Sequence, residues 1–255
     1  MITKIELDAL VSEYETSDFI KNDPIQFLYK VSEDREKEII GFIASLFAYG
    51  NRKVFIKKIN EIFTKTDKDL LGFIKNGDFS ILKGFEYRFA KDSDIIPIFN
   101  CLSKLYNESL GLKELFLYAK NNANIEKNML NERFFQIIVD YFYSNAPTTV
   151  GSGFYHMIPN PKNGGAMKRM NMFLRWLVRK GPVDIGLWNF INTAELLIPL
   201  DVHVARVSRD MGLLKRKSND FKAVIELSDK LREFSPEDPI KYDFAMFAFG
   251  IMNNK

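Results

Sequence analysis

The residues best suited to chemistry lie in the stretch 158–214. A turn rich in Gly and Pro leads into a predicted helix that begins near Met167, with Lys168 in its first turn. Farther along, Asp201 directly precedes a second predicted helix. A lysine amine can act as a nucleophile, and a carboxylate can stabilise positive charge that develops on a substrate. These two residues are therefore the first candidates for a reaction centre.

The position of Lys168 is poorly explained by stability. Successive residues of a helix rotate by about 100°, which places Lys168 on one face with Arg175 and Arg179 and the apolar residues on the opposite face. A helix amino terminus disfavours a cation, so a lysine there is better explained by a function. Structural explanations exist for the others, because Arg175 and Arg179 can be solvated surface charge and Asp201 can cap its helix.

Charge is unevenly distributed along the chain. The formal net charge is +3, yet the stretch 151–217 holds eleven basic residues against four acidic ones. Such an asymmetry favours a polyanion as partner, although a helical protein can also carry a basic patch without a specific purpose.

Composition excludes several kinds of site. The single Cys101 rules out a disulfide within the chain and a four-cysteine iron–sulfur cluster. Together with His156 and His203 it is too little for a thiolate–imidazole zinc site. The amino terminus has neither a signal-peptide pattern nor a long apolar run, so we expect a cytoplasmic protein without a membrane segment.

Apolar residues recur with a helical period almost throughout, and no strand-like alternation is evident. The sequence therefore predicts an all-α protein. The clearest helices before the Gly- and Pro-rich turn are expected over residues 36–49, 51–66, 95–108, 112–120 and 131–144.

The segment 198–207 resembles the helix-hairpin-helix DNA glycosylases, the superfamily of endonuclease III and the 8-oxoguanine glycosylases. It reads Ile-Pro-Leu-Asp-Val-His-Val-Ala-Arg-Val and looks like the segment that holds the essential aspartate of that superfamily, here Asp201. The turn before Lys168 and Lys168 itself occupy the places of the DNA-binding hairpin and the nucleophilic lysine.

The spacing departs from most members of that superfamily. Lys168 and Asp201 are 33 positions apart, which is a longer separation than usual, and the hairpin lacks the Leu-Pro-Gly-x-Gly consensus. The longer gap, and a basic residue two helical turns after the lysine, Arg175, resemble the archaeal-type 8-oxoguanine glycosylase branch. The chain also resembles an uncharacterised bacterial family similar to that branch.

The resemblance implies a two-lobed all-α fold with the active-site cleft between the lobes. Residues 36–199 would form a central lobe that ends in the helix-hairpin-helix. Residues 1–35 and 200–255 would together form the second lobe.

Further roles follow from the resemblance. Asp243 would read the edge of guanine, whose N1–H and N2 amino group are donors, and Phe247 would stack on the base; without the resemblance, Phe247 would be assigned to the core. Asn51 would fill the gap left by an extruded base, or simply form a polar turn. Contacts to the DNA backbone are expected from Arg52, Lys53, Asn163, Gly164, Gly165, Arg175, Arg179 and Arg206.

The function implied is removal of 8-oxoguanine from double-stranded DNA by base flipping, with Schiff-base formation on Lys168 assisted by Asp201 and strand cleavage by lyase activity at the abasic site. No metal or cofactor and no obligate protein partner is expected, and the protein would be a monomer. Two alternatives are a monofunctional glycosylase for other damaged bases, in which Lys168 only binds phosphate, and a non-catalytic helical protein that binds nucleic acid.

Overall fold

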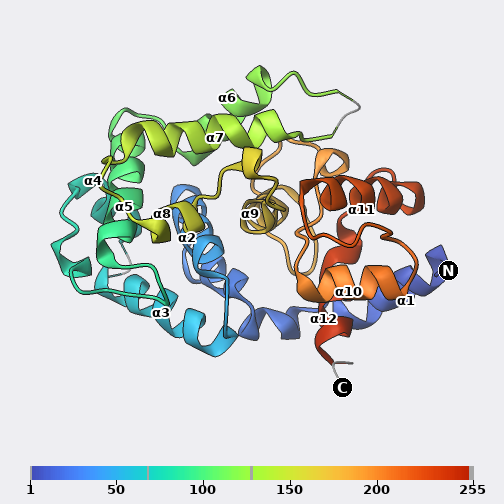
Figure 1. The fold of residues 1–255 in the computed structure, drawn as a ribbon. Coiled ribbons are helices and arrows are strands. Elements are labelled where there is room, and N and C mark those ends of the chain that lie inside the picture. The colour runs from blue at the N-terminus through green and yellow to red at the C-terminus, as the bar shows by residue number, and fades with distance from the viewer. Residues whose placement is uncertain (1, 68, 127–128, 253–255) are drawn as a thin grey trace. The chain divides into compact units, whose positions relative to one another are not determined.

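The regular elements of the chain are helices in the computed structural model, which describes residues 2–67, 69–126 and 129–252. No strand is present in these ranges, so the predicted all-α class is confirmed. The α-helices, labelled in Figure 1, are α1 (Lys4–Tyr14), α2 (Asp34–Phe47), α3 (Arg52–Lys65), α4 (Leu70–Asn76), α5 (Asp92–Asn107), α6 (Leu112–Asn122), α7 (Glu132–Asn145), α8 (Ser152–Met157), α9 (Lys168–Val178), α10 (Val202–Asp210), α11 (Phe221–Phe234) and α12 (Lys241–Met252).

Short 3₁₀ helices connect several of these elements. They are η1 (Ser17–Asn22), η2 (Pro24–Lys30), η3 (Ser80–Leu82), η4 (Pro161–Asn163) and η5 (Thr193–Glu195). Pairing of the β type is limited, within the described residues, to isolated bridges between Tyr87 and Ala90, Gly165 and Asp220, and Lys180 and Ile185.

The chain divides into two compact units, each of which is described by itself. Unit 1 comprises Met1–Asn22, Ile125–Glu132 and Pro161–Lys255, and unit 2 comprises Asp23–Asn124 and Arg133–Asn160. Residues 161–199 therefore group with both chain ends, whereas the sequence-based lobes place that range with the helices that begin at residue 36.

Unit 2 is organised around α2. This helix is buried on nearly every side and packs against η2, α3, α4 and α6. Phe42 of α2 stacks on Phe142 of α7 with ring centroids 5.3 Å apart. Asp94 at the start of α5 accepts a hydrogen bond from the N–H of Gly151 at 2.8 Å, which joins α5 to the segment before α8. The apolar period seen in the sequence thus corresponds to real burial.

Unit 1 carries the stretch 161–214. In it α12 packs against both α1 and α10, so the blue and red ends of the chain lie side by side in Figure 1. The central helix α9 has buried residues on both faces, and Phe173 of α9 packs edge-on against Trp188 at a centroid distance of 5.3 Å. Helix α9 is therefore buried within unit 1, and Lys168 is its first residue.

None of the helices that the structure describes is both long and apolar enough to cross a membrane.

Candidate active site

The turn before α9 places Lys168 at the first position of that helix. The N–H of Gly164 donates to the carbonyl of Pro161 at 2.8 Å, and the carbonyl of Gly164 accepts from the N–H of Phe221 at 2.9 Å. Gly164 has φ +75°, and the N-cap residue Met167 has φ +49°, a left-handed conformation that is unusual for a residue with a side chain. The hydrogen bond from Phe221 joins the turn to the start of α11, and the turn ends where α9 begins at Lys168.

The side chains of Lys168, the first residue of α9, and Asp201, the N-cap of α10, lie close together. Nζ of Lys168 is 3.9 Å from Oδ2 of Asp201, and the two side chains are 29 % and 14 % exposed. The other carboxylate oxygen, Oδ1, caps α10 by accepting from the N–H groups of His203 and Val204 at 2.8 and 2.9 Å. The capping role and the pairing with Lys168, both considered for Asp201 from the sequence, are therefore compatible, because Oδ1 caps α10 while Oδ2 lies near the lysine.

Asp243 interacts electrostatically with Asp201 of this pair. It is on α12, is buried, and its Oδ2 accepts a hydrogen bond from Nη1 of Arg175. Burial raises the pKa of Asp243 to about 7; Arg175 opposes the rise, and the negative charge of Asp201 adds to it. Since the charge on Asp201 influences Asp243, these two carboxylates belong to one electrostatic site.

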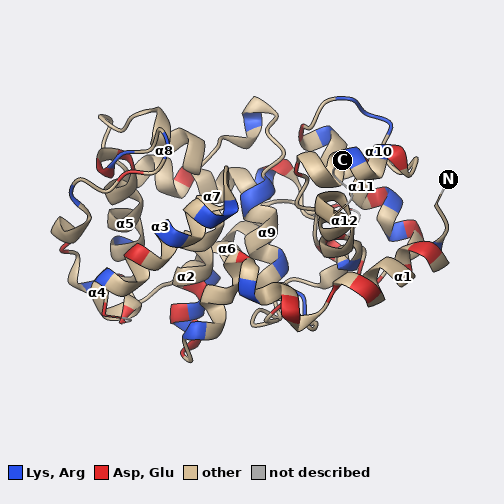
Figure 2. Cartoon of the chain, turned by 90° about the horizontal axis from the view of Figure 1, so that it is seen from below, with Lys and Arg blue, Asp and Glu red and all other residues tan. Residues whose placement is uncertain are grey.

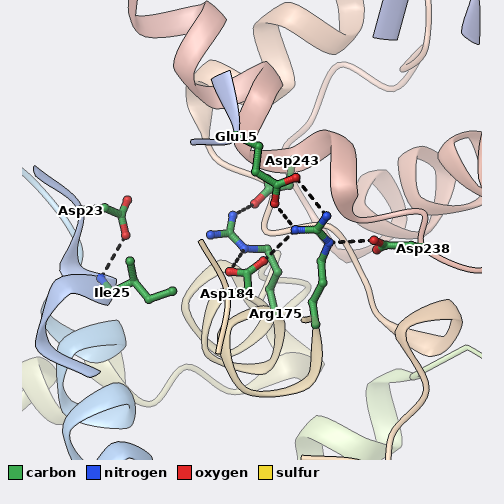
Figure 3. A network of polar contacts seen from close by, with 8 residues as sticks. Glu15, Asp23, Ile25, Arg175, Asp184, Asp238 and Asp243 are labelled. Atoms are coloured by element: carbon green, nitrogen blue, oxygen red, sulfur yellow. Dashed lines mark hydrogen bonds and ion pairs between the residues drawn. The ribbon is translucent and has the colours of Figure 1, made fainter. Parts of the chain in front are cut away.

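Arg175 and Arg179 are not on a phosphate-binding face, and that prediction is wrong. Both are buried, with 4 % and 5 % of the residue exposed. Asp184 bridges them, since its Oδ1 lies 3.2 Å from Nε of Arg175 and its Oδ2 lies 3.0 Å from Nη1 of Arg179 (Figure 3). A guanidinium group held by buried carboxylates cannot at the same time neutralise a solvent-side phosphate.

The carboxylates around Arg179 come from distant parts of the sequence. Nη1 of Arg179 donates to Oε1 of Glu15, and Nη2 donates to Oε2 of Glu15 at 3.0 Å. Nε of Arg179 donates to Oδ2 of Asp238 at 2.8 Å. The face that looked solvated in sequence is therefore covered by acidic side chains. Figure 3 shows the guanidinium groups surrounded by these acids, which include Asp243. We name Glu15, Arg175, Arg179, Asp184, Asp238 and Asp243 the buried ion cluster.

Sequence reasoning missed three members of the buried ion cluster: Glu15, Asp184 and Asp238. Asp184 follows Arg175 and Arg179 closely in sequence, and an acid after a basic helix was the signal that could have identified it. Glu15 and Asp238 have no such signal, because only tertiary packing brings them to Arg179.

Two other predicted residues lie along α10 and α12. Phe247 is partly buried, and its ring centroid is 6.0 Å from that of His203, two residues after Asp201. Arg206 has a side chain that is 41 % exposed, lies 3.6 Å from Asp210 and donates from Nη2 to the carbonyl of Gly250 at 2.7 Å. Arg206 thus joins α10 to α12 while part of it stays open to solvent.

The turn residues Asn163 and Gly165 stay candidates for a phosphate contact. Asn163 is exposed and Gly165 is partly exposed, and a side chain added at Gly165 would meet no atom within 4 Å. The amide of Gly164, in contrast, already donates to Pro161, so it is not the group that would hold a phosphate. Positive charge in this unit also lies on the loop between α10 and α11, drawn blue in Figure 2, which carries Lys215, Arg216 and Lys217.

Asn51, Arg52 and Lys53 belong to unit 2. Asn51 is the N-cap of α3, and its Oδ1 accepts from the N–H of Val54 at 3.3 Å. Arg52 is partly buried and Lys53 is exposed, and no acidic residue shares the first turn of α3 with them. The wedge and phosphate roles assigned to these residues stay predictions.

No group of three or more His, Cys, Asp and Glu side chains is arranged to hold a metal ion among the residues that the structure describes. The arrangement at Lys168 and Asp201 offers an amine and a carboxylate, and Asp243 adds a second carboxyl whose pKa is raised to about 7 by burial.

Comparison with known proteins assigns a family. A family model described as "Protein of unknown function (DUF2400)" matches residues 23–252, which is most of the chain. A search of curated proteins and a search of solved structures each give no match. The chain belongs to the DUF2400 family.

Proposed function

We propose that this member of the DUF2400 family is a DNA glycosylase with lyase activity that removes oxidised guanine from double-stranded DNA. The observation that carries the proposal is the approach of Lys168 Nζ to Asp201 Oδ2 at 3.9 Å, with both side chains partly open to solvent. An amine beside a carboxylate is what nucleophilic substitution at a sugar carbon requires: one group attacks and the other stabilises positive charge.

The fold proposed for the site is that of the helix-hairpin-helix glycosylases. Three features support it: a glycine turn before α9, a lysine at the first position of α9, and an aspartate at the N-cap of α10. The two-lobed arrangement with a cleft is part of the same proposal. It rests on the resemblance of residues 198–207 together with the all-helical architecture.

The proposed reaction begins when the damaged nucleotide leaves the duplex, which costs a few kcal/mol and is easiest at damaged positions. Nζ of Lys168 forms a bond to C1′ as the bond between C1′ and the base nitrogen breaks. The base leaves with the bonding electron pair and takes up a proton. Asp201 stabilises the positive charge that develops on the sugar while this exchange occurs.

The same amine accounts for the proposed strand cleavage. Opening of the sugar ring leaves a Schiff base between Nζ of Lys168 and C1′. This iminium group makes the C2′ protons acidic, so loss of one of them expels the 3′-phosphate by β-elimination. Each of these steps moves a proton or exchanges a carbon–heteroatom bond, and none changes an oxidation state.

Recognition of the base is assigned to Asp243 and Phe247, four residues apart on α12. Guanine presents two donors on its Watson–Crick edge, and an ionised carboxylate is a pure acceptor. Asp243 would accept these donors through Oδ1 when the flipped base reaches this buried carboxyl, while Oδ2 keeps its hydrogen bond from Arg175. Phe247, next to His203 on α10, would supply the stacking surface.

Borohydride trapping on a duplex with one 8-oxoguanine tests the proposal. The wild-type protein should release the base, cut the strand and give a covalent adduct. Lys168→Gln should bind the duplex without giving an adduct, and the control Lys222→Gln, an exposed lysine on α11, should behave as wild type. Base release without any adduct would instead identify a monofunctional glycosylase. Binding without base release would identify a non-catalytic nucleic-acid-binding protein.

A further inference from the structure

A short turn in unit 2 presents an arginine and a phenylalanine to solvent. Tyr87 and Ala90 pair through two backbone hydrogen bonds of 2.9 and 3.0 Å, which leaves Arg88 and Phe89 as the two central residues. Arg88 has φ +55°, a conformation for which glycine is the usual choice at this position of a two-residue turn. Arg88 is exposed, and Phe89 is 45 % exposed.

The turn is fixed against the segment before α3. Tyr87 is buried and hydrogen-bonds reciprocally with Tyr49 through hydroxyl and carbonyl groups. A Cβ at Gly50 would collide with Nη1 of Arg88 and come within 3.0 Å of the Tyr87 hydroxyl. The side chain of Arg88 therefore lies over the glycine backbone, with its guanidinium carbon 6.0 Å from the centre of the Tyr49 ring.

Three rings gather at this turn. The ring of Phe89 lies 4.4 Å from that of His156 on α8, nearly perpendicular to it, and 5.7 Å from that of Tyr49. The rings of Tyr49 and His156 are 4.8 Å apart, and His156 is exposed. We name Tyr49, Arg88, Phe89 and His156 the aromatic turn surface.

Stability does not explain the aromatic turn surface. A single exposed apolar side chain is common, but here an exposed phenylalanine joins other rings and an arginine in one place. A non-glycine residue at positive φ costs on the order of 1 kcal/mol or more. Glycine at position 88 would form the turn without the cost of a positive φ. The combination is better explained by a ligand that needs both a ring face and a cation.

The charge around the surface identifies the kind of ligand. Arg88 and Lys91 lie in or beside the turn, and Lys53 is exposed in the first turn of α3, three positions after Gly50. The acidic residues near the turn are Glu86, Asp92 and Asp94. The carboxylate of Asp92 accepts from the N–H groups of Gly84 and Ser93, and buried Asp94 accepts from those of Lys91 and Gly151, so backbone N–H groups already engage both. Rings that are open to solvent, interleaved with cations, are the requirement for binding unpaired nucleotides, whose bases stack on aromatic faces and whose phosphates attract the cations.

We propose that the aromatic turn surface binds unpaired nucleotides of a DNA strand, with a base stacked on Phe89 and a neighbouring phosphate held by Arg88. This inference goes beyond the proposed glycosylase activity. It needs no damaged base, involves no bond cleavage, and rests on residues of unit 2 alone.

Binding of the full chain to labelled oligothymidylate, followed by fluorescence polarisation, tests the inference. Stacking of one base contributes about 1–3 kcal/mol, so Phe89→Ala should weaken binding by about fivefold or more. Phe89→Trp should retain binding because it keeps a ring face. The matched control is Tyr118→Ala, which removes an aromatic side chain that is 60 % exposed on α6 and should leave the affinity unchanged.

Arg88→Gly separates binding from folding. It relieves the positive φ, so the variant should be at least as stable as wild type, yet it should bind oligothymidylate more weakly and with a smaller salt dependence. Equal affinity of Phe89→Ala and Tyr118→Ala, or wild-type affinity of Arg88→Gly, would overturn the inference. So would an equal loss on single-stranded and fully paired DNA, because stacking requires an unpaired base. Lys168→Gln should bind oligothymidylate normally, so failure of the glycosylase proposal is a separate result.

Discussion

Replacement of Arg175 by Met should destabilise the protein rather than weaken its contacts to DNA phosphates. The substitution removes the guanidinium group from Asp243 and Asp184, both buried, while roughly keeping the side-chain volume. Loss of one partner from a buried ion pair costs about 3–5 kcal/mol. Asp184 keeps Arg179 as a partner, and Asp243 can take up a proton because its pKa is already about 7. The loss should therefore lie near the lower end, about 3 kcal/mol.

Urea denaturation at pH 8 and pH 6 measures this effect. Without Arg175 the carboxylate of Asp243 is more costly when ionised, so the free energy of unfolding should fall further at pH 8 than at pH 6. Arg206→Met is the control, because a half-exposed arginine on the same unit should cost less than about 1 kcal/mol.

The opposite outcome would be equally clear. A solvent-exposed Arg175 that contacts a phosphate would give a variant of nearly wild-type stability, with a salt slope for DNA binding reduced by about one unit. That pair of results would refute the assignment of Arg175 to the buried ion cluster.

Three further predictions concern individual side chains. The folded-state pKa of Asp243, about 7, exceeds its ordinary value of 3.8, so the folded protein binds an additional proton between these two pH values. The stability linked to this proton is lost as pH rises through about 7. Over that interval Asp243→Asn should lose less stability than wild type in urea titrations. Gly164→Ala should cost about 1 kcal/mol because φ is +75°, whereas Gly165→Ala should unfold like wild type but bind DNA more weakly if a phosphate approaches its backbone. Burial raises the pKa of the Cys101 thiol to about 12, so iodoacetamide at pH 8 should modify the native protein far more slowly than the urea-unfolded protein.

Helix positions were predictable where one face had a clear apolar period. The ranges expected over 36–49 and 131–144 correspond to α2 (Asp34–Phe47) and α7 (Glu132–Asn145), with ends shifted by one or two residues. Local signals sufficed there, because Gly50 follows the first periodic pattern and Pro147 follows the second, and both residues end helices.

The start of α9 and the N-cap of α10 were also predictable from local residues. Lys168 follows a turn rich in Gly and Pro, in which Gly164 has a positive φ, and Asp201 is a preferred capping residue. Their approach to 3.9 Å does not follow from either signal alone, since 33 positions separate them.

The buried ion cluster could not be predicted from helical periodicity. Rotation about α9 places Arg175 and Arg179 on one face, but it does not say whether that face meets water or protein. Helix α12 and the C-terminal end of α1 supply the carboxylates of Asp243 and Glu15, and these elements are distant in sequence. A charged helix face is usually solvated, and tertiary packing overrode that expectation here.

The central claim concerns one amine, and locating a trapped adduct tests it most directly. The protein would be reduced with borohydride in the presence of a duplex that contains 8-oxoguanine, digested with protease and mapped by mass spectrometry. We predict that the sugar remnant is attached to Nζ of Lys168, and that Asp201→Asn, tested separately, greatly reduces its yield. An adduct on any other lysine, or an equal yield with Lys168→Gln, would contradict the account.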